Sequence, residues 1–287
     1  MKLDKHILGN IQYISFYTIC FVDKIYKKII KYLNKDSVIA LIKKDPSILQ
    51  YLSYNMKNNK DIVSIAVKLD SSCLKYASLE LRDDKDIVLL AVEQNGSAMA
   101  YVGEKMKRNR DIVLKSFEKN GRLDLIKKIF RDDKEVVMKA IINCGESLEY
   151  VSKRLRENKE VVLASIAHRG YNLRYASIYL RYDEEIVYTA VSNDGWALQF
   201  APDHLKDNKE IVLAAVQNNG RALEFSSDRL KNNKQVVMCA LKDDAMYIQY
   251  VSDELKNDKD IYLLVNKMRN IENNRSNKLH NIIFRFY

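Results

Sequence analysis

The chain has 287 residues, of which 47% are hydrophobic and 30% are charged, a composition that is normal for a packed soluble helical protein and excludes a disordered one. With only two prolines and eight glycines, no Pro/Gly-rich linker divides it, so we expect one continuous ordered array without a hinge. The formal charge of +10 favours acidic partners, although most lysines lie within a few residues of an acid, which cancels part of the field.

Cysteine usage and hydropathy indicate the compartment. Cys20, Cys73, Cys144 and Cys239 lie far apart without a C-x-x-C pair, which is typical of free thiols in a reducing compartment. The apolar stretch 14–22 is shorter than the roughly 20 residues that span a bilayer. We therefore expect a soluble cytoplasmic protein, in the cell or in a host, without membrane insertion; association with a virus particle is the alternative location.

The first predicted element, residues 1–34, does not share the pattern that follows it. Phe21, Ile25, Ile29 and Leu33 lie four residues apart, which favours a helix covering the exposed end of the array. We interpret the segment as an N-terminal helical cap, with a small adaptor-binding module as the alternative.

Residues 35–258 are tandem repeats. A lysine, an acid and two branched apolar residues recur, as in Lys60-Asp61-Ile62-Val63 and Lys209-Glu210-Ile211-Val212, at multiples of about 25 residues. One step, from Arg110 to Lys134, is a residue shorter. The units begin at residues 35, 60, 85, 110, 134, 159, 184, 209 and 234. Such short units must stack on their neighbours to bury a core.

Each unit opens with a predicted helix. Apolar residues such as Ile211, Ala214 and Ala215 follow helical spacing, and an Asn or Asp before the lysine is a good N-cap. The predicted N-caps are Asn59, Asp84, Asn109, Asp133, Asn158, Asp183, Asn208, Asn233 and Asp258. An Asn or Asp followed by Gly, as in Asp194-Gly195, predicts that the glycine ends the helix in the left-handed conformation.

A second helix of about ten residues is predicted after this turn. It carries Leu and, two residues later, an aromatic residue, as in Leu198-x-Phe200, followed by Ser or Pro at the start of a helical turn. Two helices, each about 15 Å long, then form a hairpin. The fold class that we predict is all-α: an α-solenoid of stacked short helix pairs, with about nine repeats of 25 residues and helical caps at both ends.

Three departures interrupt the regularity. The unit beginning at Arg110 lacks the Leu-x-aromatic signature, so a local change of curvature is expected there. Ser71 and Ala245 replace the glycine, so those turns must close without it. Residues 259–287 are read as a partial repeat, with a first helix at Ile261–Met268, a polar loop at 270–277 and a C-terminal cap or adhesive tail at 282–287.

The pattern resembles a tandem short helical-repeat family of unknown function, found in giant viruses of amoebae, protists and protist-associated bacteria. Its units read like D-K-x-I/V-V-x-x-A-V-x-x-N/D-G-x-A-L-x-Y/F-A-S-x-x-L-K/R-N/D, and the resemblance is strongest over residues 209–233. Tetratricopeptide and HEAT repeats, with periods of about 34 and about 40 residues, match poorly. The resemblance implies a helical repeat fold and assigns no catalytic or binding residue.

One basic residue follows the last apolar position of every unit. We call this set the basic ridge: Lys57, Arg82, Lys107, Arg131, Arg156, Arg181, Lys206, Lys231 and Lys256. Stacked helices lie about 8–10 Å apart, so the basic ridge could follow an anionic polymer. The favoured alternative is that each side chain pairs with the acid at the second position of a nearby helix (Asp61, Asp86, Glu160 or Glu210) or covers helix-terminal carbonyls.

An aromatic column also runs through the units: Tyr51, Tyr76, Tyr101, Tyr150, Tyr175, Phe200, Phe225 and Tyr250. We interpret it as core between repeats rather than as a base-stacking surface. Partner recognition is expected instead at the variable position after the turn, where Tyr171, Trp196 and Arg221 fall in successive units. Clusters of this type anchor interfaces, and the alternative is a partly buried cover over the turn.

Nothing in the sequence indicates catalysis. The four histidines are isolated, no metal-ligand spacing or phosphate-binding loop is present, and Asp-Asp pairs such as Asp83-Asp84 fall at helix boundaries, where capping explains them. We expect no enzyme activity, cofactor or metal.

The leading functional hypothesis is a protein interaction scaffold that binds another protein through its repeat surface. The alternative is binding of nucleic acid or another anionic surface by the basic ridge, and a weaker one is a structural component of a viral particle.

Overall fold

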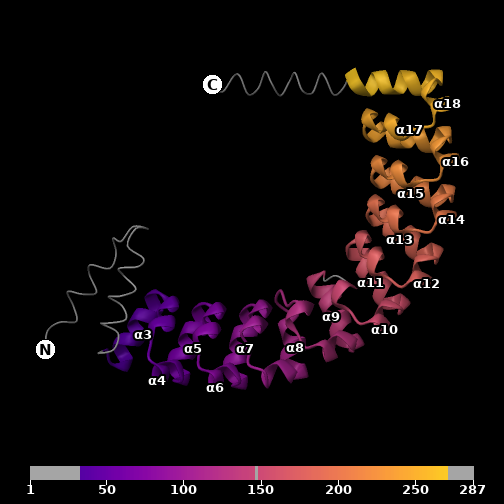
Figure 1. Ribbon diagram of the computed structural model, residues 1–287. Helices are drawn as coiled ribbons and strands as arrows, with labels where there is room; N and C mark the ends of the chain where they lie inside the picture. Colours follow the sequence, from indigo (N-terminus) through magenta and orange to yellow (C-terminus); the bar gives the residue numbers. More distant parts are fainter. Residues whose placement is uncertain (1–32, 146–147, 271–287) are drawn as a thin grey trace, which may run out of the picture. The chain divides into compact units, whose positions relative to one another are not determined.

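A computed structural model describes residues 33–145 and 148–270, in which the regular elements are helices and no strand occurs (Figure 1). The chain divides into two compact units, Met1–Lys127 and Lys128–Tyr287. This differs from the expectation of one uninterrupted array. The boundary falls inside the repeat that begins at Arg110, the one that is a residue short.

Most repeats consist of a long α-helix, a 3-10 helix (η) and a short α-helix, and in the repeats that begin at Lys85 and Arg110 a second 3-10 helix takes the place of the short α-helix. The first unit contains α3 (Lys35–Lys44), η4 (Pro46–Tyr51), α4 (Tyr54–Lys57), α5 (Lys60–Leu69), η5 (Ser71–Tyr76), α6 (Leu79–Arg82), α7 (Lys85–Gln94), η6 (Gly96–Ala100), η7 (Met106–Arg108), α8 (Arg110–Ser116) and η8 (Leu123–Leu125).

The second unit repeats this order. It contains η9 (Lys128–Asp132), α9 (Lys134–Cys144), η10 (Leu148–Tyr150), α10 (Lys153–Arg156), α11 (Lys159–His168), η11 (Gly170–Tyr175), α12 (Ile178–Arg181), α13 (Glu184–Asn193), η12 (Gly195–Phe200), α14 (Asp203–Lys206), α15 (Lys209–Asn218), η13 (Gly220–Phe225), α16 (Asp228–Lys231), α17 (Lys234–Asp243), η14 (Ala245–Tyr250) and α18 (Asp253–Lys256). Residues 259–270 are also helical, in agreement with the helix expected there.

The predicted helix starts are confirmed. The side chain of Asn208, for example, accepts hydrogen bonds from the backbone N–H groups of Glu210 (3.0 Å) and Ile211 (3.3 Å). The other predicted N-caps accept equivalent bonds. Capping satisfies N–H groups that a helix cannot pair internally, and a Ser, Thr, Asn or Asp cap typically contributes about 1 kcal/mol.

The long helices pack side by side within each unit, as α13 does against α11 and α15. Ile211, Val212, Ala215 and Val216 of α15 are all at most 3% exposed, and equivalent positions are buried in the other long helices. The core therefore lies between consecutive repeats, which is why a single repeat cannot supply it alone.

The predicted ten-residue second helix is wrong in detail, because the segment is split in two. After η13 the chain leaves the helical conformation at Ser226 (φ −71°, ψ 163°), before α16 starts at Asp228. The next residue, Ser227, donates its N–H to the carbonyl of Lys206 in the preceding repeat at 2.9 Å. A backbone group committed to the preceding repeat cannot also continue its own helix.

The glycine after each turn has a different role from the predicted one. Among the described residues only Asn120 and Gly145 have positive φ, so Gly145 alone is a left-handed glycine. At Gly195 an added Cβ would instead lie 2.5 Å from the carbonyl oxygen of Ala215 in the next long helix. The turn itself is closed by Asp194, whose carboxylate accepts the N–H of Trp196 at 3.0 Å. The glycine thus allows close approach of two repeats.

The repeat that begins at Arg110 is shortened where the sequence departs from the pattern. Its helix α8 spans seven residues, and Phe117, which is fully buried, fills the space after it. Ile126 and Phe130 are also buried. Residues 1–32 of the N-terminal cap predicted for 1–34, and the whole of the C-terminal cap predicted for 282–287, lie outside the described residues.

We predict that Gly195→Ala lowers the free energy of unfolding by about 2 kcal/mol, because its Cβ would meet backbone that cannot move aside cheaply. Gly145→Ala is the matched control. No atom lies within 4 Å of the Cβ added there, so only the left-handed backbone opposes it, at a cost of about 1 kcal/mol. Urea denaturation of the two variants measures both. Equal losses would show that close approach is not what selects glycine at position 195.

Candidate interaction surface

The basic ridge lies at the ends of the short helices and is mostly half-buried. Eight of its nine residues are of intermediate exposure, and only Lys256, at the end of the row, is exposed. The side chains of Lys107 and Lys231 are 19% and 25% exposed. Desolvation by burial lowers the pKa of Lys57. These lysine and arginine stems cover apolar surface, as long cationic side chains commonly do.

The backbone of the ridge links the repeats. The carbonyl oxygens of Lys57, Arg82, Arg131, Arg156, Lys206 and Lys231 each accept an N–H from the start of the next short segment, at 2.7–3.1 Å. Arg181 differs, because the residue in the donor position is Pro202, which has no N–H. The Arg82 side chain also donates through Nε to the carbonyl of Tyr101 at 2.5 Å, so here the ridge covers a helix-terminal carbonyl as one interpretation proposed.

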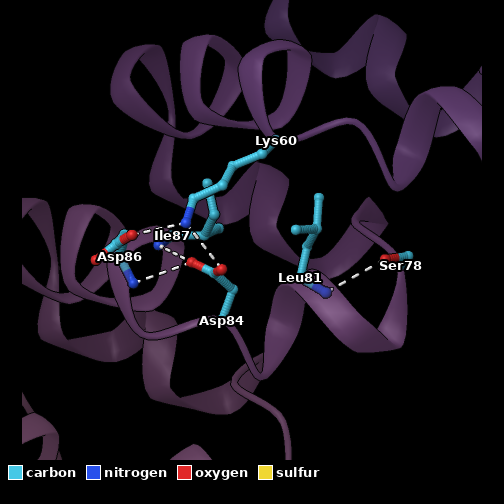
Figure 2. A network of polar contacts seen from close by, with 6 residues as sticks. All are labelled: Lys60, Ser78, Leu81, Asp84, Asp86 and Ile87. Atoms are coloured by element: carbon cyan, nitrogen blue, oxygen red, sulfur yellow. Dashed lines mark hydrogen bonds and ion pairs between the residues drawn. The ribbon is translucent and has the colours of Figure 1, made fainter.

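The acids at the second helical position pair with other lysines than predicted. Their partner is the first lysine of the preceding repeat, as in Lys60, whose Nζ lies 2.6 Å from Asp86 and 2.9 Å from the N-cap Asp84 (Figure 2). We call such a set of ion pairs between successive repeats a rung. Equivalent rungs join Lys159 to Asp183 and Glu185, and Lys234 to Asp258 and Asp260. Lys35 and Lys134 pair with Asp61 and Glu160. The expected pairing of these acids with the ridge is therefore wrong.

Where a lysine bonds to the N-cap aspartate of the next repeat, the pKa of both groups shifts. The hydrogen bond from Lys159 lowers the pKa of Asp183, and the hydrogen bonds to Asp183 and Glu185 raise the pKa of Lys159. Lys234 and Asp258 shift in the same directions through their own hydrogen bonds. Because these side chains are largely exposed, each rung stabilises the fold only modestly.

At two places in the second unit the residues that would form a rung lack complementary charge. Glu184 replaces the lysine opposite Asn208 and Glu210, and Lys209 stands opposite the uncharged Asn233 and Gln235. Glu184 and Lys209 begin the two repeats of the second unit that carry Trp196 and Arg221.

The aromatic column is half-buried rather than a true core. All eight of its members have intermediate exposure. Within the column, the Tyr175 hydroxyl donates to Glu149 at 3.3 Å, and Phe200 and Phe225 contact aromatic residues of the preceding repeat. One side of each ring packs on the repeats, and the other side contributes to a surface made by the η helices.

Tyr171, Trp196 and Arg221 occupy equivalent positions in η11, η12 and η13, and each contacts the next repeat or the previous one. The Tyr171 ring meets Phe200 edge-on at 5.0 Å, and Trp196 lies 5.6 Å from Phe225. The Arg221 guanidinium lies 4.7 Å from the centre of the Trp196 ring. Tyr171 is 40% exposed, and the Arg221 side chain 43%. These residues therefore cover a neighbouring ring and still face solvent, and their role in partner recognition stays a prediction.

Sequence reasoning missed Arg174, which completes this surface. Its guanidinium lies 5.2 Å from the Tyr171 ring and 4.9 Å from the Tyr175 ring. At the other end Arg221 bonds to Glu224 at 3.2 Å, and this hydrogen bond, with a smaller contribution from Tyr250, raises the pKa of Arg221. Arg174 directly precedes Tyr175 of the aromatic column in the sequence, and this adjacency is a signal that could have identified it. We call Tyr171, Arg174, Trp196 and Arg221 the aromatic-arginine row.

Asparagine ties also join the turns beneath the row. The side chain of Asn218 accepts the N–H of Gly195 at 2.8 Å and donates to the carbonyl of Ser192 at 3.1 Å. Asn193 makes the equivalent bonds to Gly170 and Ala167. The backbone on which the row is mounted is therefore held from both sides.

The described residues also bear on metal binding, membrane crossing and thiol chemistry. No group of three or more His, Cys, Asp or Glu residues that could hold a metal ion occurs in residues 33–145 and 148–270. Over the same range, no helix has the length and apolar character needed to cross a membrane. Cys73, Cys144 and Cys239 are free thiols, and burial raises the pKa of Cys73 to about 12.

A family model described as "Domain of unknown function (DUF4116)" matches five consecutive segments of the chain: 34–82, 84–131, 133–181, 183–231 and 233–274. Each of the first four matches spans two of the 25-residue repeats. Neither a curated protein nor a solved structure matches the chain.

We predict that Gln235→Glu stabilises the protein by roughly 0.5–1 kcal/mol, because the new acid faces Lys209 and also lies in the first turn of α17, where the helix dipole favours negative charge. The same substitution in a Lys209→Gln background retains only the dipole effect. Thermal unfolding of the four proteins gives the coupling. Absence of coupling would mean that Lys209 does not form a rung with residue 235.

We predict that the stability difference between the wild type and Lys159→Gln depends on pH. Because the pKa of Asp183 is lowered in the folded state, its contribution is present above the unfolded value of about 3.9 and is lost as pH falls through the folded value. The raised pKa of Lys159 places the opposite loss above about pH 10.4. Urea midpoints from neutral to acidic pH should converge, and a constant difference would contradict an ionic rung.

Proposed function

The chain belongs to the DUF4116 family, whose function is unknown, and we propose that this member is a non-catalytic protein interaction scaffold that binds another protein through the aromatic-arginine row. We further propose that the repeats form an α-solenoid of about nine 25-residue units, in which this row is one patch of an extended surface.

The observation that carries the proposal is the stacking of Arg221 on Trp196, 4.7 Å from the ring centre, with both residues at a position whose identity varies between repeats. Ser72 and Ser97 occupy the same position in the first unit, where the η helices form without an aromatic or arginine there. Folding therefore does not require the large side chains. Trp, Tyr and Arg are also the residues that dominate binding energy at protein interfaces.

Rigidity of the surface also supports protein binding. The row is mounted on 3-10 helices whose turns are held by Asp194, Asn193 and Asn218. Partly buried aromatic rings lose little conformational freedom when a partner covers them, so little affinity is lost to ordering.

The nucleic-acid alternative has less support. An anion-binding ridge would have to present its cationic groups to solvent, whereas eight of the nine ridge residues are half-buried. The aromatic rings offer no row of open faces for base stacking either, since Tyr171 meets Phe200 edge-on and Arg221 covers Trp196. The structural role in a viral particle rests on the distribution of the resembling family.

The proposal is tested by affinity purification with the full chain as bait, using the wild type and Trp196→Ala. Trp196 occurs at a position where serine is tolerated, so we expect the variant to fold. We expect a set of proteins that the wild type retains after nuclease treatment and that Trp196→Ala loses at least about tenfold, since a central aromatic anchor contributes about 2 kcal/mol or more. Tyr188→Ala, which removes a 51% exposed ring on α13, is the matched control.

A direct measurement accompanies the capture experiment. Trp196 is the single tryptophan of the chain, so its fluorescence reports on this position alone. Binding of a captured protein should shift the emission to shorter wavelength as the ring loses water. Recovery of the same proteins with Trp196→Ala, or loss of all of them on nuclease treatment, would contradict the proposal.

A further inference from the structure

The first residues of the five consecutive short segments from η9 to α16 form a row of their own, which Asp253 of the next short segment, α18, continues. We call it the short-helix row: Lys128, Lys153, Ile178, Asp203 and Asp228. These residues begin η9, α10, α12, α14 and α16, and all are exposed. Figure 1 shows α12, α14 and α16 following one another along one side of the long helices.

An apolar island lies at the middle of this row. On α12, Ile178 is 56% exposed and Tyr179 is 80% exposed, and Tyr182 directly after the helix is 55% exposed. The centre of the Tyr182 ring lies 5.3 Å from the centre of the His204 ring. Three large apolar side chains this exposed on one turn are unusual for a surface that remains in water.

The side chains beside the row are neutralised locally. Arg154 pairs with Asp132 (3.1 Å), and Arg229 pairs with Asp207 (2.9 Å). Within the described residues Lys153 and Asp203 form no ion pair, and the Asp228 side chain is fully exposed at 3.6 Å from Lys231. The row itself therefore determines the pattern of charge, which reads basic, basic, apolar, acidic, acidic.

The same polarity extends through the second unit. Residues 128–181 contain 11 Lys and Arg against seven Asp and Glu, whereas residues 182–260 contain 15 Asp and Glu against nine Lys and Arg. The change of sign falls at α12, where the apolar island lies. A surface whose two ends carry opposite charge around an apolar centre is complementary to itself when it is rotated by 180°.

We propose that the short-helix row is the interface of a homodimer, in which a twofold axis passes near Ile178. The rotation places Lys153 of one copy opposite Asp203 of the other, and Lys128 opposite Asp228, each contact occurring twice. The two apolar islands meet at the centre, where Tyr179 and Ile178 lose their contact with water. The short-helix row shares no residue with the aromatic-arginine row.

The size of the row indicates a weak association. Five segments spaced about 8–10 Å apart extend over roughly 40 Å, which is the length of an ordinary interface, but large exposed apolar side chains occur only at the α12 turn and at Ile129 of η9. We expect a dissociation constant in the range of about 1–100 µM, increasing with salt because the contacts that set the orientation are exposed ion pairs.

Sedimentation velocity of the full chain, over about three decades of concentration around this range, tests the proposal. We expect reversible dimers, and Tyr179→Ser should raise the dissociation constant about a hundredfold because each dimer loses two aromatic anchors. Leu79→Ser is the matched control. Leu79 is 72% exposed and begins the short helix α6 of the first unit, outside the row, so this substitution should leave association unchanged.

Charge reversal tests the twofold geometry. Lys153→Asp and Asp203→Lys should each raise the dissociation constant about tenfold, because each places like charges opposite one another twice. Three proteins decide the orientation. The double variant should dimerise like the wild type. An equimolar mixture of the two single variants should form a heterodimer with about the wild-type dissociation constant, because opposite charges face one another again.

Each possible result of these measurements either supports the homodimer or overturns it. A chain that stays monomeric over the whole range would overturn the proposal, as would dimers that are indifferent to Tyr179→Ser. Dimers that lose stability with each single reversal but are not restored in the double variant would overturn the twofold arrangement. Circular dichroism of each variant, which should match that of the wild type because the substituted residues are exposed, separates loss of association from loss of folding.

Discussion

Close backbone approach between successive repeats is the constraint on which the rest of this structure depends. The turn glycine places its backbone against a carbonyl of the next long helix, as Gly195 does with Ala215, and a Cβ there would lie 2.5 Å from the oxygen. That contact determines how far apart two repeats lie. Once the spacing is set, the side chain of Asn218 can accept the N–H of Gly195, and the N–H of Ser227 can reach Lys206. Hydrogen bonds are short-ranged, so both ties would be lost if the repeats were separated by another ångström.

The polar ties have a second consequence, which is that several charged side chains are committed to neighbouring repeats. Lys60 reaches Asp84 and Asp86, and Arg229 reaches Asp207. What remains for recognition is the set of side chains that these ladders leave out, such as Lys153, Asp203 and the apolar residues of α12. Exposed pairs contribute little energy each, but together they orient successive repeats.

Much of this fold could be predicted from periodicity, because helix starts are specified by local chemistry. Asn208 caps α15 through its own side chain, and Ile211 and Ala215 lie three to four residues apart on its buried face. The remainder depends on contacts between repeats that no single unit encodes. The second helix breaks at Ser226 because the N–H of Ser227 is bonded to the preceding repeat, and Gly195 allows close approach of two repeats rather than a left-handed dihedral angle. The partner of Asp86 was likewise mispredicted, because a 26-residue separation is not visible in a local pattern.

The candidate surfaces show how such an array can acquire recognition without changing its fold. Position 196 and its equivalents follow a turn whose geometry is set by Asp194 and Gly195, so serine, tyrosine, tryptophan and arginine all fit there. The same holds for the first residue of each short helix, where Lys153, Ile178 and Asp203 leave the backbone alike. Large side chains at these positions still contact one neighbour, as Trp196 contacts Phe225. A substitution there therefore alters a patch made by two repeats, and surface identity is built from pairs of adjacent units rather than from single ones.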